Sequence, residues 1–226
     1  MDHSNYLNNC IRSSRIGLYR GLGIIGILLT VVGCSRGPSK VDVPSYDPRG
    51  AAARAMKEYD TNQDGFIAGE ELDKAAGLKA AMKTFDSDQD GKISQQEITE
   101  RVATWARMGV GITKFNCIVT LDGSPLEGAT ITFVPEKFLA ELLQEAQDVT
   151  NLVGTATPRI PKEKRPSPDT PPGMQVGLYQ VVISKKQGDE ELIPAKYNTA
   201  TTLGQEVAND DWAIANNRVQ FNLTSK

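Results

Sequence analysis

The spacing of apolar residues divides the chain into two regions. In residues 51–110 apolar side chains recur every three or four positions, which is typical of amphipathic helices. From Thr113 onward, apolar and polar residues alternate instead, which indicates strands with one buried face. The first alternating run contains Phe115, Cys117, Val119 and Leu121. The pattern therefore predicts a helical region followed by a sheet region.

The helical region contains two acidic loops of twelve residues, at 60–71 and 86–97. Oxygen-bearing side chains stand at loop positions 1, 3, 5 and 12, and glycine stands at position 6, where the chain reverses sharply. Position 7 contributes only a backbone carbonyl, and about seven hard oxygens suit Ca²⁺ better than Mg²⁺. The expected ligands are Asp60, Asn62, Asp64, Phe66 and Glu71 in the first loop, and Asp86, Asp88, Asp90, Lys92 and Glu97 in the second.

This doubled pattern resembles a paired EF-hand module, which implies two calcium sites. The loops begin 26 residues apart, so the pair is compact. We expect Gly77 to cut short the exit helix of the first hand (70–76), and residues 78–85 to form an entering helix of about two turns. Short helices favour a structural or buffering role. The second loop offers four carboxylates and the first offers three, so we predict tighter binding at the second.

An apolar stripe runs along the helices that flank the two loops. It has two interpretations, the core of the module itself or an exposed groove for a target. Its members are Met56, Tyr59, Met82, Phe85, Val102 and Trp105, and the last helix is expected to end near Gly109.

The N-terminus has the pattern of an export signal. Three arginines precede an apolar run at residues 21–32, which is shorter than the roughly 20 residues of a membrane span. The run ends in Val-Val-Gly-Cys, which resembles the bacterial lipobox and implies that residues 1–33 are a signal peptide and that Cys34 is lipidated. The alternatives are a plain transmembrane anchor, or a signal cut elsewhere with Cys34 incidental. Ser35 implies sorting to the outer membrane under the same family rule.

Residues 34–50 contain three prolines and several small residues, so we expect a flexible tether. Beyond the loops, alternation recurs around Ile131, Ile183 and Phe221. This predicts a small antiparallel β-sandwich of roughly seven strands over residues 113–226. Leucines spaced for one face predict a helical insertion at 138–149.

The sheet region carries a second resemblance. The motifs VTLDGSPLEGA followed by ITFVP, PPG followed by GLYQVVI, and IPAKYN are similar to those of carboxypeptidase-regulatory-like (transthyretin-like) domains. The resemblance implies a non-catalytic, surface-exposed sandwich. Enzymes on this fold that hydrolyse purine-derived substrates rely on histidines, and this chain has only His3, within the expected signal peptide.

Composition narrows the function classes further. A mature chain without histidine excludes Ser-His-Asp and Cys-His catalysis and the usual catalytic zinc sites. The net charge of -3 and the lack of a long basic stripe argue against nucleic acid as a partner. Cys117 lies in an alternating apolar run, which favours a buried structural thiol.

The sequence thus predicts an α+β multidomain protein that is not an enzyme. We expect a calcium-binding cell-envelope protein, lipid-anchored in the membrane, whose EF-hand pair (51–110) is stabilised by Ca²⁺ and presents the sandwich. The expected further partner is an envelope protein or polysaccharide. The alternatives are a calcium sensor that regulates partner binding, and an envelope hydrolase that uses carboxylates alone.

Overall fold

The computed structural model describes residues 41–226. The expected signal peptide and Cys34 lie outside the described residues, as do residues 35–40 of the expected tether. All described residues belong to one compact unit, Pro38–Lys226, which contains both the helical region and the sheet region. Among residues 41–226, no helix combines the length and the apolar character that crossing a bilayer requires.

The first helix begins inside the expected tether. Helix α1 (Pro48–Tyr59) starts with proline at its first position, and the Asp47 side chain caps it by accepting a hydrogen bond from Gly50 N at 3.1 Å. Just before it, the Tyr46 ring packs 6.1 Å from the Trp105 ring, and its hydroxyl donates to the Val176 carbonyl. The chain is therefore packed against the protein from at least Tyr46 onward.

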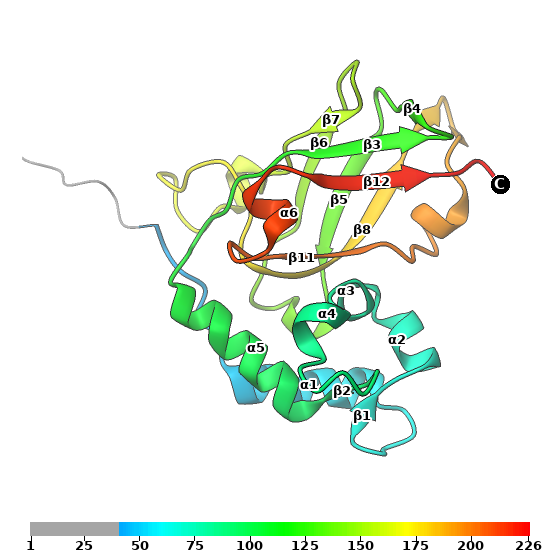
Figure 1. The fold of residues 1–226 in the computed structure, drawn as a ribbon. Coiled ribbons are helices and arrows are strands. Elements are labelled where there is room, and N and C mark those ends of the chain that lie inside the picture. The colour runs from blue at the N-terminus through cyan, green and yellow to red at the C-terminus, as the bar shows by residue number, and fades with distance from the viewer. Residues whose placement is uncertain (1–40) are drawn as a thin grey trace, which may run out of the picture. The chain divides into compact units, whose positions relative to one another are not determined.

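The helical region contains two longer helices, α1 and α5 (Gln95–Met108), three short ones between them, and a two-stranded ladder (Figure 1). In chain order, α1 is followed by β1 (Phe66–Ile67), α2 (Glu70–Lys74), α3 (Ala76–Ala80), α4 (Met82–Phe85), β2 (Ile93–Ser94) and α5 (Gln95–Met108). Helix α5 begins with a capping box between Ser94 and Glu97, and it ends at Gly109 in the left-handed conformation, as expected.

The expectation for Gly77 was wrong. The exit helix α2 ends earlier, at Lys74, and Gly77 lies inside α3, where it is buried. A Cβ at this position would lie 2.7 Å from a carboxylate oxygen of Glu136, so the glycine serves a close approach and does not end a helix.

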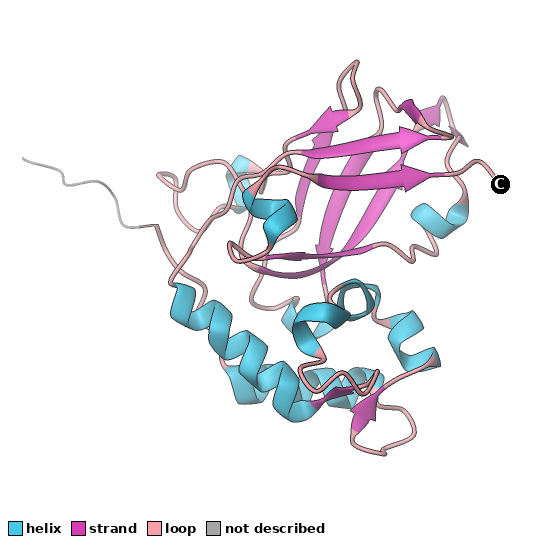
Figure 2. Ribbon diagram, viewed as in Figure 1, coloured by secondary structure: helices cyan, strands magenta, loops and turns pink. Residues whose placement is uncertain are grey.

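The sheet region consists of two sheets, drawn in magenta in Figure 2. The first has the strand order β11-β8-β5-β6, and the second has the order β12-β3-β4, with β7 also paired to β3. The strands are β3 (Cys117–Leu121), β4 (Ser124–Pro125), β5 (Thr130–Pro135), β6 (Ala146–Val149), β7 (Thr155–Ala156), β8 (Gly177–Ser184), β11 (Gly204–Val207) and β12 (Val219–Leu223).

Several smaller elements complete this region. They are a hairpin of β9 (Lys186–Gln187) and β10 (Glu190–Glu191), helix α6 (Trp212–Ala215), and the 3₁₀ turns η1 (Lys137–Leu139), η2 (Lys162–Lys164) and η3 (Ala195–Tyr197).

A shared aromatic core joins the two sheets. The Phe133 ring from β5 makes edge contacts with Phe115, Tyr179 and Phe221, the last from β12 in the other sheet. This gives the sandwich-like layering that the alternation predicted. Cys117 is buried, as expected, and desolvation raises the pKa of its thiol to about 12.

Two further expectations about the sandwich were wrong. Residues 138–149 do not form a helix, because only the single turn η1 is helical and β6 then pairs with β5, with Ala146 opposite Phe133. Pairing with β6 satisfies backbone groups of β5 from Thr130 to Phe133, which outweighs the local leucine spacing. The sandwich is also not purely antiparallel, because β12 runs parallel to β3 with Phe221 opposite Val119.

Candidate metal centre

The two acidic loops have closely similar backbones. At position 6, Gly65 and Gly91 have φ of 88° and 80°, a conformation that residues with a Cβ rarely adopt. At position 4, Gln63 and Gln89 are also left-handed, with φ of 60° and 63°. Two residues of opposite backbone hand per loop produce the reversal that turns successive side chains toward one point.

Hydrogen bonds hold the first aspartate of each loop inward. Asp60 accepts bonds from the backbone N–H groups of Asp64 and Gly65, at 3.2 and 3.1 Å. Asp86 accepts the corresponding bonds in the second loop, from Asp90 at 3.1 Å and Gly91 at 2.9 Å. Each loop therefore folds around its position-1 carboxylate through the same local contacts.

The glutamate at position 12 closes each loop. Glu71 accepts a hydrogen bond from Thr61 N at 2.8 Å, and Glu97 accepts bonds of 2.8 Å from both Ser87 N and Ser94 N. Burial raises the pKa of both carboxyls, but the hydrogen bonds from backbone and hydroxyl groups outweigh it, so each pKa is lowered. Both glutamates are thus held as charged oxygen donors, which suits a hard cation.

The loops touch one another through a short ladder. Ile67 pairs with Ile93, and both are fully buried. The two position-7 residues also meet, because the Lys92 ammonium lies 4.9 Å from the centre of the Phe66 ring. The two loops therefore share a buried contact at their centre.

Three carboxylates come together in the second loop. Oxygens of Asp86, Asp88 and Glu97 all lie within 4.8 Å of one another. In the first loop, Asn62 takes the place of the second aspartate, and its amide donates to Asp64 at 3.1 Å. The residues present fit Ca²⁺ because the donors are hard oxygens.

Two segments of the chain, residues 53–74 and 78–102, match the family model described as EF hand. Each segment contains one of the acidic loops, so this part of the chain is an EF-hand region, and the match supports calcium binding. No curated protein and no solved structure matches the chain.

The structure also reveals a group that the sequence did not indicate. Glu136, at the end of β5, is fully buried and accepts hydrogen bonds from the Tyr59 hydroxyl at 2.5 Å and from Gly77 N at 2.6 Å. Tyr59 directly precedes the first loop. Desolvation raises the pKa of Glu136, although its hydrogen bonds oppose the shift. The partners lie 77 and 59 residues away in the chain, so no local pattern could identify this contact.

Proposed function

We propose that this protein is a calcium-binding, lipid-anchored protein of the cell envelope. In this proposal two Ca²⁺ ions, one per loop, stiffen the EF-hand pair, which in turn presents a non-catalytic sandwich. The role of calcium is structural. The observation that carries this proposal is the burial of the apolar stripe, because Trp105 is fully buried and Phe85 is 1 % exposed.

Burial of the stripe separates a structural role from a sensor role. In sensor EF-hands, calcium opens a pair of helices and exposes an apolar groove for a target. Here the module packs on the sandwich instead, and α3 lies so close to β11 that a Cβ on Gly204 would be 2.0 Å from the Ala76 carbonyl oxygen (Figure 1). The face that would receive a target is in contact with the chain's own sheet.

Calcium titration tests both roles at once. The variant Trp212→Phe removes the tryptophan that is 65 % exposed, so that fluorescence reports on Trp105 alone. A structural role predicts that calcium binds with a stoichiometry of two in calorimetry, with little change in Trp105 emission or in binding of an apolar dye. A strong rise in dye binding on adding calcium would favour the sensor. If calorimetry detected no binding of calcium, the calcium proposal would be overturned.

Export and anchoring rest on the signal pattern and the lipobox that ends at Cys34. We expect the mature chain to begin at an acylated Cys34 and to fractionate with the outer membrane. The test is mass spectrometry of the purified protein, with Cys34→Ala as the comparison. A mature N-terminus at another residue, or membrane association that survives Cys34→Ala, would contradict the lipid anchor.

A further inference from the structure

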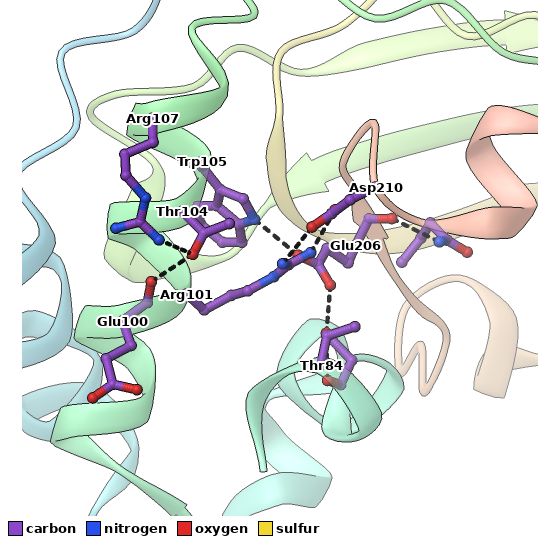
Figure 3. A network of polar contacts seen from close by, with 10 residues as sticks. Thr84, Glu100, Arg101, Thr104, Trp105, Arg107, Glu206 and Asp210 are labelled. Atoms are coloured by element: carbon purple, nitrogen blue, oxygen red, sulfur yellow. Dashed lines mark hydrogen bonds and ion pairs between the residues drawn. The ribbon is translucent and has the colours of Figure 1, made fainter. Parts of the chain in front are cut away.

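Glu206 connects the sandwich to the second EF-hand. It lies on β11 and is 3 % exposed. Its carboxylate accepts hydrogen bonds from the Thr84 hydroxyl at 2.5 Å, from Arg101 Nε at 2.6 Å and from Trp105 Nε1 at 2.8 Å (Figure 3). All three donors belong to the EF-hand region, so the charge partner of this buried carboxylate, Arg101, and its other two donors lie across the interface.

The three donors lie on the two helices of one hand. Thr84 is on α4, which leads into the loop at 86–97, and Arg101 and Trp105 are on α5, which leaves that loop. One carboxylate therefore bridges the entering and the exit helix. The angle between these helices is the quantity that changes when a sensor EF-hand binds calcium. A bridge across them holds that angle.

Other contacts strengthen the bridge. Arg101 also forms a bidentate pair with Asp210, with both N–O distances at 2.8 Å, while the rings of Phe85 and Trp105 meet edge to face at 5.9 Å. Burial lowers the pKa of Arg101, but the hydrogen bonds to Asp210 and the charge of Glu206 outweigh it, so the guanidinium stays charged. Within residues 41–226, no buried side-chain polar atom lacks a partner.

We propose that Glu206 is a positioning residue for the calcium site of the second hand. It touches none of the expected ligands and acts through α4 and α5, which it fixes in the arrangement that brings Asp86, Asp88 and Glu97 together. A site whose ligands are already in position loses less conformational entropy when the ion binds, so its affinity for the ion is higher. By linkage, calcium at this loop strengthens the contact between the hand and β11. This inference rests on the proposed calcium site at 86–97.

The test compares Glu206→Gln with Glu191→Gln, both made in the Asp60→Ala background so that the second loop alone titrates. Glu191 is a matched control because its carboxylate also accepts three hydrogen bonds, from Ser184, Lys185 and Ile193, which all lie in the sheet region. Calorimetry with calcium on the full chain, at a temperature where circular dichroism shows each variant fully folded, should give an affinity about fivefold or more weaker for Glu206→Gln. Glu191→Gln should match the parent.

A milder variant guards against misfolding. Thr84→Val keeps the side-chain volume and the Arg101 and Trp105 contacts. It removes one of the three bonds to Glu206, together with the local contact between the Thr84 hydroxyl and the Ala81 carbonyl, so we expect a smaller loss of affinity in the same direction. The rate of calcium release into a chelator should rise in both variants, because a bridge that fixes the helices slows their opening.

The outcomes separate the two proposals. If the parent binds no calcium at the second loop, the calcium assignment fails and the positioning role fails with it. If the parent binds and both folded Glu206→Gln and Thr84→Val bind equally well, only the positioning role is overturned. Should Glu206→Gln not fold, the result for Thr84→Val decides.

Discussion

The loops at 60–71 and 86–97 pair through β1 and β2, but only the second continues into a long capped helix. Helix α5 has fourteen residues and a capping box, whereas α2 has five residues and no side-chain cap at Gly69. The sandwich contacts differ as well. The first hand contacts Glu136 through the Tyr59 hydroxyl, a neutral donor, and the second contacts Glu206 through Arg101 as well as neutral donors.

This difference shows that the pattern of ligands in a loop and the contacts that hold its flanking helices in place are separate properties. Both loops contain the residues that turn the backbone and point oxygens inward. The strength of the site depends also on what holds the flanking helices. Here the second hand has the better-supported exit helix and a buried ion pair with the sandwich, whereas the ion pair of the first hand, Glu58 with Lys137, is exposed. We therefore expect the two loops to differ in calcium affinity while depending equally on their shared core.

The largest effect should come from that shared core. Ile67→Ala and Ile93→Ala each remove a fully buried side chain from the same ladder, so each should lower the free energy of unfolding by about 2–5 kcal/mol. Urea unfolding with EDTA present measures both. A cost below about 1 kcal/mol at either position would mean that the hands do not share a core there.

The next effect concerns calcium itself. Asp86→Ala should remove the tighter site and Asp60→Ala the weaker one, because the second loop has four carboxylates and the first has three. We expect the tighter dissociation constant of the intact protein to disappear in Asp86→Ala and to persist in Asp60→Ala, with the two constants about tenfold apart. Calorimetry at one ionic strength provides the comparison. A larger loss from Asp60→Ala would reverse the ranking of the loops.

A smaller effect should follow from the cap of α5. The Ser94 hydroxyl accepts a hydrogen bond from Glu97 N, so Ser94→Ala should destabilise the protein by about 1 kcal/mol. The equivalent position in the first loop is Ala68, and Ala68→Ser provides the reciprocal control. It should not destabilise the protein. Thermal unfolding followed by circular dichroism in EDTA measures both, and an unchanged midpoint for Ser94→Ala would contradict the role of the cap.

The smallest effect should be on the pH dependence of stability. It should differ between Glu136, which contacts the first hand, and Asp210, which pairs with Arg101 of the second hand. The pKa of Glu136 is raised, so its contribution to stability is full below the ordinary glutamate pKa and is lost as pH rises through its raised folded-state value. The pKa of Asp210 is lowered by its hydrogen bonds to Arg101, so its contribution is full above the ordinary aspartate pKa and is lost as pH falls through the lowered value.

Two variants reveal these opposite signs. Relative to the wild type, Glu136→Gln should become more stable as pH rises above about 4, and Asp210→Asn should become less stable as pH rises from about 2 to 5. Urea midpoints in EDTA across this range provide the measurement. If both variants diverged from the wild type with the same sign, the two contacts would not differ as the structure indicates.

The sequence predicted the loops well because their geometry is local. The residues that turn the backbone and point oxygens inward all lie within twelve positions, and the alternation that predicts strands is likewise a local signal. The match of residues 53–74 and 78–102 to the EF hand supports the EF-hand interpretation of these two segments.

The contacts that could not be predicted from the sequence are those between residues far apart in the chain. Glu136 and Glu206 each follow ordinary strand residues, and nothing nearby shows that a partner more than 50 residues away will bury them. The parallel pairing of β12 with β3 is likewise a choice between distant strands. At residues 138–149 a local pattern gave a wrong prediction. The leucines there have helical spacing and are buried in the sandwich, but the segment contains only a single 3₁₀ turn and no α-helix.

The bridge at Glu206 has a consequence for the order in which the protein matures. Arg101 and Glu206 are 105 residues apart, so the second loop leaves the ribosome, and any export channel, well before the strand that supports it. With Glu206 positioning the helices as proposed, the hand can form its local turns early but reaches its full arrangement only after β11 has joined β8. Contacts of such sequence separation form slowly. High-affinity calcium binding should therefore appear late in refolding, and its time course would report on assembly of the distant sheet.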